Sequence, residues 1–265
     1  MSYGFHLSTA GAITGMRRLD TVANNLANST TVGFKADMLA LTARKPENLE
    51  HAGLHADTNA SLDALGGGSL FHPSAIDLRQ GSLRETKNPL DIAIHGDGFL
   101  MLETPKSKGA RGAKPSNDVL LTRAGSLTRD PNGRLVTTAT GAPLLDTNGK
   151  TITLNPTDAN VRIDGNGRVF QGEDEVARLA LVVPQNLDNL HKEGRDAMRL
   201  VGGKFKPAPD TTEIRAGALE ESTVDAVATL AELVRVSRGI EFSTRLMQFQ
   251  DQMTSRLVDT FGRFG

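Results

Sequence analysis

The chain has 265 residues, enough for one large domain or two small ones with a sizeable core. Hydrophobic residues make up 38% and charged residues 23%, a composition typical of globular proteins rather than disordered ones. The net charge of -1 argues against a general nucleic-acid binder, and the 4% aromatic content leaves few platforms for stacking bases or sugars. The absence of cysteine excludes disulfides, thiolate nucleophiles and cysteine-based zinc sites.

Residues 1–10 contain neither the basic leader nor the apolar run of a signal peptide. No segment approaches the roughly 20 apolar residues that cross a membrane as a helix. These two features alone favour a cytoplasmic protein.

The first predicted element is a helix that ends at residues 28–33, where Asn, Ser, Thr and Gly cluster. Its apolar positions follow a heptad pattern, at Ala12, Met16, Leu19, Ala23 and Leu26. The segment is also rich in poor helix formers, among them Gly11 and Gly15. We therefore expect a helix that forms when small residues let a neighbouring helix approach closely. The alternative is an ordinary amphipathic helix docked on its own domain.

Residues 37–84 are predicted to form an extended or flexible connection. Residues 47–74 within it are rich in Gly, Ala, Asp, His and Ser. His51 and His55 have the spacing of two ligands on one helix face, but their surroundings carry no helix signal, so we expect no metal site there.

Residues 85–216 are predicted to form an antiparallel, meander-like β domain. Apolar runs suited to strands are separated by Asn132-Gly133, Asn148-Gly149 and Asn166-Gly167, and Asn-Gly is a strong hairpin signal. The Asp residues that precede these turns give the loops some likeness to calcium sites. However, Arg168 occupies a position where an oxygen ligand would be needed, so hairpin turns are the better interpretation. The predicted strands lie at 90–94, 99–102, 119–121, 135–136, 151–154, 161–163, 169–170 and 176–183.

Residues 104–118 carry four basic side chains among Gly, Pro and Ser. We interpret them as an exposed, solvated loop, with contact to an anionic surface as the alternative.

The last predicted element is a long helix over residues 223–261. The run Ser222-Thr-Val-Asp225 matches a capping box at its start. Leu233, Ile240 and Met247 recur at seven-residue spacing and define an apolar seam. Such a long helix with an apolar seam needs a partner.

Enzyme signatures are missing from the sequence. It contains no phosphate-binding Gly-rich loop of the Walker type, no G-x-S-x-G elbow and no H-E-x-x-H motif. We therefore predict no catalytic residue, no metal site and no cofactor.

Four sequence blocks, in the same order and across nearly the whole chain, resemble the axial proteins of the bacterial flagellar rod and hook, FlgE, FlgF and FlgG. The first is LDTVANNLAN at 19–28 with TVGFK at 31–35, and the second is NPLDIAIHGDGF at 88–99. The third is TRAGSL at 122–127 with NGRLV at 132–136, and the fourth is GALEESTV at 217–224.

The resemblance implies an α+β fold, in which an antiparallel all-β central domain lies between long N- and C-terminal α-helices. These helices would pair as a coiled-coil-like inner domain, formed by residues 1–36 and 217–265, in a helical homo-oligomer that also contacts other rod and hook proteins. It further implies export through the flagellar type III apparatus without a cleaved signal peptide. The expected location then becomes the periplasmic rod rather than the cytoplasm, with no nucleic-acid partner and no membrane span.

Within this family, residues 36–45 resemble a FlgF-like proximal rod protein more than a FlgG-like distal one, because they lack an aromatic- and Leu-rich stretch. The interface expected between subunits comprises Leu19, Asn24, Asn25, Leu26, Asn28, Gly33, Phe34, Leu233, Ile240 and Met247. Three alternatives stay open: a FlgG-like subunit, a secreted ligand-binding β domain on a helical stalk, and an enzyme of unknown class.

Overall fold

The computed structural model describes residues 2–43, 69–71, 75–104, 119–155, 160–202 and 204–261. Two compact units are formed by segments that are distant in sequence. Unit 1 comprises residues 1–27, 37–77 and 225–265, and unit 2 comprises residues 28–36 and 78–224. Residues 28–36 and 217–224 thus pack with the β strands, whereas the sequence had placed both in the helical domain.

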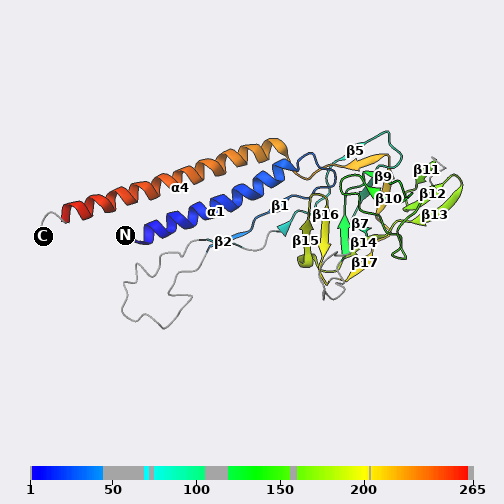
Figure 1. The fold of residues 1–265 in the computed structure, drawn as a ribbon, viewed down its shortest axis with the longest axis horizontal. Helices are drawn as coiled ribbons and strands as arrows, with labels where there is room; N and C mark the ends of the chain where they lie inside the picture. The colour runs from blue at the N-terminus through cyan, green and yellow to red at the C-terminus, as the bar shows by residue number, and fades with distance from the viewer. Residues whose placement is uncertain are drawn as a thin grey trace. The chain divides into compact units, whose positions relative to one another are not determined.

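Unit 1 is built on two helices, α1 (Ser2–Ala27) and α4 (Ala226–Phe261). Figure 1 shows them side by side, α1 in blue and α4 in orange to red. They run antiparallel, since Thr9 Oγ1 contacts Met247 Sδ near one end of the pair and Arg18 reaches Glu232 nearer the other. The other described strands of the unit are short and antiparallel: β1 (Asp37–Met38) pairs with β4 (Ala75–Ile76), and β2 (Leu41–Ala43) with β3 (Ser69–Phe71).

The α4 helix begins one turn later than the capping-box pattern predicted. Asp225 Oδ1 accepts hydrogen bonds from the amides of Val227 (2.9 Å) and Ala228 (3.1 Å), which would otherwise lack partners in the first helical turn. Ser222 Oγ accepts only from the amide of Val224 (3.2 Å). Asp225 is therefore the N-cap, and Ser222 lies before the helix.

Unit 2 is antiparallel throughout its described strand pairs, as the sequence predicted. Its largest sheet has six strands in the order β15-β16-β8-β7-β14-β17. Because β7 lies between β8 and β14, this order is not the simple meander that was predicted. The strands are β15 (Leu190–Glu193), β16 (Ala197–Leu200), β8 (Val119–Thr122), β7 (Phe99–Leu102), β14 (Leu181–Pro184) and β17 (Phe205–Pro207), with the short 3-10 helix η1 (Leu187–Asn189) before β15.

Smaller sheets surround the same core. Buried apolar side chains from many of these strands, among them Ile92, Leu100, Leu135 and Ile163, form this core and are almost completely shielded from solvent. The remaining strands form the pairs β18 (Glu213–Ala216) with β6 (Ile92–His95), β19 (Ala218–Glu220) with β5 (Leu83–Glu85) and β10 (Leu135–Thr137) with β9 (Leu127–Arg129), and the three-stranded sheet β11 (Val161–Ile163), β12 (Arg168–Gln171) and β13 (Asp174–Arg178).

Most predicted strands formed, with two differences. Residues 151–154 make isolated bridges to Leu145 and Arg134 rather than a regular strand. The predicted run 176–183 is divided between β13 and β14, which belong to different sheets.

Candidate functional site: assembly surfaces

The facing surfaces of α1 and α4 follow heptad spacing. On α4 the less exposed positions are Thr229, Glu232, Leu233, Val236, Ser237, Ile240, Ser243, Met247 and Gln250, most of them at heptad spacing. On α1 they include Ala12, Gly15, Leu19, Val22 and Leu26. The predicted seam was right at Ala12, Leu19 and Leu26 but wrong at Met16, which is 53% exposed, and at Ala23, which is also exposed.

Gly15 explains why the α1 seam differs from the apolar pattern. A Cβ atom at Gly15 would lie 2.7 Å from Ile240 Cγ1, closer than packed carbons approach. A Cβ at Gly11 would meet Ser243 Oγ at an ordinary 3.6 Å. The side chain of Ile240 thus occupies the space left by Gly15, and a glycine forms part of the contact where the sequence suggested Met16.

A second apolar surface on α4 is exposed, with no cover from the described residues of unit 1. We call it the α4 stripe; it consists of Phe242, Leu246, Phe249, Met253 and Leu257, which are all exposed. Phe242 and Phe249, its two aromatic side chains, are its most exposed members, at 64% and 60%. Phe249, Met253 and Leu257 line a groove with Gln252, Arg256 and Thr260.

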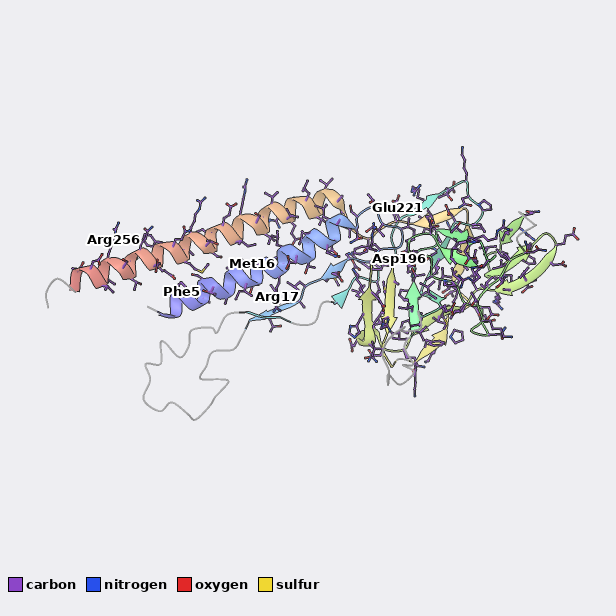
Figure 2. The ribbon with its side chains drawn as sticks, viewed as in Figure 1. Phe5, Met16, Arg17, Asp196, Glu221 and Arg256 are labelled. Carbon is purple, nitrogen blue, oxygen red and sulfur yellow. The ribbon has the colours of Figure 1, made fainter. Side chains whose placement is uncertain are left out.

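Exposed apolar side chains also lie on α1. They include Phe5, Leu7, Ile13 and Met16, and Figure 2 labels Phe5 and Met16 on this helix. Large exposed apolar patches are typical of interaction surfaces, but Leu7 lies on another face of α1 than Phe5 and Met16, because successive residues are about 100° apart around a helix.

The asparagines predicted at the interface lie in three different settings. Asn25 is buried within unit 1, where its side chain donates to the Asp37 carbonyl (2.9 Å) and accepts from the Asp37 amide (2.9 Å). Asn24 is exposed. Asn28 is buried in unit 2 and accepts a hydrogen bond from the Thr31 hydroxyl at Oδ1 (3.2 Å). Asn25 and Asn28 therefore have partners within their own chain.

Residues 33–36 pair with residues 220–223 inside unit 2. The Gly33 amide donates to the Glu220 carbonyl (2.8 Å), and the Thr223 amide donates to the Phe34 carbonyl (3.1 Å). The Thr223 hydroxyl accepts from the Ala36 amide (2.9 Å). The TVGFK block at 31–35 and the GALEESTV block at 217–224, which are distant in the sequence, therefore meet as neighbouring extended segments.

Gly33 is required in this pairing for two reasons. Its φ of +68° lies in the left-handed region, which side chains other than glycine rarely adopt. A Cβ there would lie 2.5 Å from the Arg123 carbonyl carbon, and backbone cannot move aside as a flexible side chain can. Phe34 follows with its ring buried, and the Lys192 ammonium lies 3.9 Å from the ring centroid.

In each of the three Asp-containing turns, the aspartate carboxylate accepts hydrogen bonds from residues of the same turn. Asp130 Oδ1 accepts from the amides of Asn132 (2.9 Å) and Arg134 (2.8 Å), while Oδ2 accepts from Arg134 Nε (2.8 Å). Asp164 repeats this pattern with Asn166 and Arg168, and Asp146 accepts from the amides of Asn148 and Lys150. The turns at 132–133 and 166–167 connect β9 to β10 and β11 to β12, so the prediction of hairpin turns is confirmed for both.

These hydrogen bonds also affect the acidity of the turn aspartates. Burial raises the pKa of each carboxyl, but hydrogen bonds and positive charge from the following residues outweigh it. The pKa of Asp130, Asp146 and Asp164 is therefore lowered from the ordinary value of 3.8.

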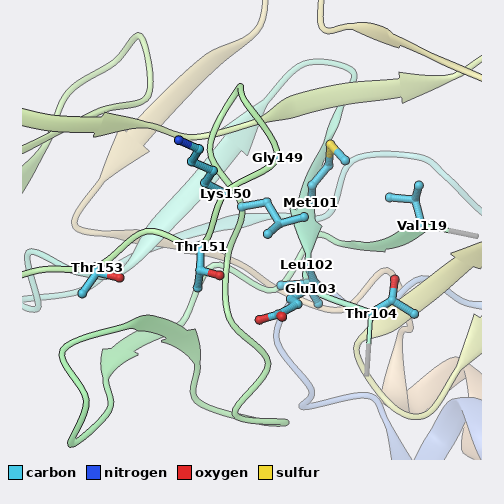
Figure 3. A pocket seen from close by; sticks show the side chains of 10 residues that line it. Met101, Leu102, Glu103, Thr104, Val119, Gly149, Lys150, Thr151 and Thr153 are labelled. Atoms are coloured by element: carbon cyan, nitrogen blue, oxygen red, sulfur yellow. The ribbon is translucent and has the colours of Figure 1, made fainter. Parts of the chain in front are cut away.

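The described residues offer little that resembles a chemical centre. No three His, Asp or Glu side chains among them gather as metal ligands would. An open depression of 620 Å³ is lined by Glu103, Lys150, Thr151 and Thr153 together with apolar side chains (Figure 3). His51, His55 and nearly all of the basic loop 104–118 lie outside the described residues. Over the described part of the chain, no helix has both the length and the apolar content to cross a membrane.

Paired terminal helices with uncovered apolar surfaces, together with an antiparallel β unit, are features of a structural subunit that associates through its ends. Family models agree: "Flagella basal body rod protein" matches residues 9–35, "Flagellar hook protein FlgE/F/G D1 domain" matches 93–171 and "Flagellar basal body rod FlgEFG protein C-terminal" matches 215–260.

Curated relatives extend this similarity over nearly the full length. The flagellar basal-body rod protein FlgF of Caulobacter vibrioides is 28% identical over 99% of both chains. FlgF of Mesorhizobium japonicum is 28% identical over 93% of this chain and 92% of its own. FlgG of Bacillus subtilis is 28% identical over 95% of this chain and 98% of its own. The chain belongs to the FlgF/FlgG family of flagellar basal-body rod proteins and is most like FlgF.

Sequence reasoning missed two groups of residues in these surfaces. Val22 of the α1 seam was missed, whereas Gly15 is one of the small residues at which close approach of a neighbouring helix was expected. Lys35, Arg123 and Glu220 form a buried ionic cluster in unit 2. Each of these three residues lies within a recognised sequence block, but nothing in the blocks indicated that they meet.

Proposed function

We propose that this chain is a structural subunit of the proximal flagellar rod, FlgF-like, without catalytic activity. It assembles with further copies of itself and with other rod and hook proteins into the periplasmic shaft that transmits torque to the hook. The observation that carries this proposal is the α4 stripe, which lies beside a seam already covered by α1 and leaves a long apolar helix face for another subunit.

The heptad spacing of both helices supports a coiled-coil-like pairing of α1 with α4. In the assembly, the α4 stripe and the exposed apolar residues of α1 contact helices of neighbouring copies. The predicted interface residues divide accordingly: Leu19, Leu26, Leu233, Ile240 and Met247 stabilise the pair, while Asn25, Asn28, Gly33 and Phe34 fix the chain beyond it. Asn24, which is exposed, faces a neighbouring subunit.

Export as an unfolded chain through the flagellar type III apparatus, without a cleaved signal peptide, completes the proposal. The weak helix propensity of α1 supports it, since glycine in a helix interior costs about 1 kcal/mol relative to alanine and eases unfolding. A FlgG-like distal position is the second candidate, supported by the similarity to Bacillus subtilis FlgG over nearly both full lengths.

Cross-linking in isolated basal bodies distinguishes these positions. The chain has no native cysteine, so one introduced cysteine is the only thiol that a reagent can modify in it. A proximal subunit is expected to cross-link to itself and to rod proteins but not to the hook. Cross-links to the hook protein would favour the distal position, and absence of the chain from basal bodies would contradict both.

A further inference from the structure

We propose that Lys35, Arg123 and Glu220 form a latch that makes the folding of unit 2 depend on both of its end segments. Lys35 follows the sharp turn after α1, and Glu220 ends β19 shortly before α4. Arg123 follows β8 in the middle of the chain. This inference goes beyond the proposed function and does not depend on it.

The latch is removed from solvent. The side chains of Lys35, Arg123 and Glu220 are 1%, 4% and 0% exposed. Charges this deeply buried are retained only when they are paired and hydrogen-bonded. Loss of one member leaves its partners as uncompensated charges in the interior, which is strongly destabilising.

Glu220 is the centre of the latch because its carboxylate joins three distant segments. Oε1 accepts from Lys35 Nζ (2.6 Å) and from the Gly81 amide (2.9 Å), and Oε2 accepts from Arg123 Nη1 (3.2 Å). Arg123 Nη2 donates a hydrogen bond to the Gly96 carbonyl (2.8 Å), and the Arg123 guanidinium lies 5.2 Å from the Phe99 ring centroid. The carboxylate therefore links the first segment of unit 2 to the loops before β5 and after β6.

Folding of unit 2 therefore requires the two ends of its sequence. Without residues 33–36, Glu220 loses the Lys35 ammonium, and its carbonyl loses the Gly33 amide. Without residue 220, Lys35 and Arg123 lose their shared anion. When the chain becomes available for folding from its N-terminus onward, unit 2 cannot complete its fold until Glu220 is also available.

The adjacent residue provides a matched control. Glu221, which Figure 2 labels, also forms an ion pair, to Arg84 Nε at 3.2 Å, but both side chains are about half exposed. Such exposed pairs contribute little to stability. Glu220→Gln and Glu221→Gln are therefore the same chemical change at neighbouring positions, with opposite burial.

The test is amide hydrogen exchange of the purified full-length chain, read by mass spectrometry. Glu220→Gln and Lys35→Met are each expected to accelerate exchange roughly a hundredfold or more, the scale on which a broken buried pair acts. The acceleration is expected together in residues 31–36, in β5 with β19, and in β6 with β18. Glu221→Gln is expected to exchange as the unaltered chain does.

Three results would overturn the latch. They are equal exchange in Glu220→Gln and Glu221→Gln, acceleration confined to residues 31–36, and strictly additive effects in the double variant Lys35→Met/Glu220→Gln, because coupled partners are not additive. If Glu220→Gln does not fold, Glu220→Asp replaces it, since aspartate keeps the charge but reaches less far. The latch predicts accelerated exchange over the same three regions in that variant, and exchange like that of the unaltered chain would contradict it.

Discussion

Single residues decide how closely the backbones of this chain approach one another. Gly15 makes room for Ile240 between the helices, and Gly33 makes room for the backbone of Arg123 within unit 2. Both glycines stand in recognisable sequence contexts, a G-x-x-x-G pair and the TVGFK block. Their partners could not be read from the sequence, because each is about 90 residues or more away by number.

Glycine-to-alanine changes at positions 11 and 15 are predicted to have different effects on stability. At Gly11 the added Cβ makes an ordinary contact, so Gly11→Ala is expected to stabilise α1 by about 1 kcal/mol through helix propensity. At Gly15 the overlap with Ile240 is expected to offset that gain, since overpacking costs roughly 1–3 kcal/mol. Thermal unfolding followed by the helical circular dichroism signal measures both. Equal stabilisation by the two variants would show that the helices do not pack through Gly15.

The turn aspartates predict a loss of stability in acid. Their pKa is lowered in the folded chain, so their contribution is fully present above the ordinary pKa of 3.8 and is lost as pH falls through the folded value. The thermal midpoint of β-sheet unfolding is therefore expected to decrease as the pH is lowered below about 4. Asp130→Asn and Asp164→Asn are expected to lower the midpoint at pH 7 and to flatten this acid decline. Curves for these variants that run parallel to that of the unaltered chain would contradict the assignment.

Among the elements, the two terminal helices were predicted more accurately than the sheets. Residues 2–27 and 226–261 form helices close to the predicted ranges, because heptad periodicity and the Asn/Gly-rich stop are local signals. Strand positions were also largely predictable from apolar runs and Asn-Gly turns. Strand neighbours were not: β15, β16, β18 and β19 were absent from the predicted set. The pairing of β16 with β8, β18 with β6 and β19 with β5 depends on contacts that no local pattern encodes.

The start of α4 gives a prediction at the element scale. Asp225→Ala is expected to destabilise the first turn of α4 by about 1 kcal/mol, because it removes the acceptor for two amides. Ser222→Ala is expected to have a smaller effect, since its hydroxyl accepts from one amide outside the helix. Hydrogen exchange of residues 226–229 compares the two variants. A larger effect at Ser222 would restore the capping box that the sequence suggested.

For the whole molecule, the central claim is that the terminal helices serve assembly. The α4 stripe supports this claim, because a large exposed apolar face favours association with another molecule. The covered seam and the stripe lie on the same helix, so one element can hold its own chain together and contact another copy. The sequence analysis assigned Leu233, Ile240 and Met247 to the interface between subunits, whereas in the single chain they are among the less exposed positions of α4.

Cysteine cross-linking between copies at Phe249 tests this claim most directly. Phe249→Cys places the only thiol of the chain within the α4 stripe, and Gln248→Cys places one on an exposed neighbouring position outside it. In isolated basal bodies, the account predicts that the thiol at 249 is shielded from a soluble maleimide or forms links between subunits, while the thiol at 248 is more readily labelled. Equal, rapid labelling at both positions in assembled rods would contradict the account.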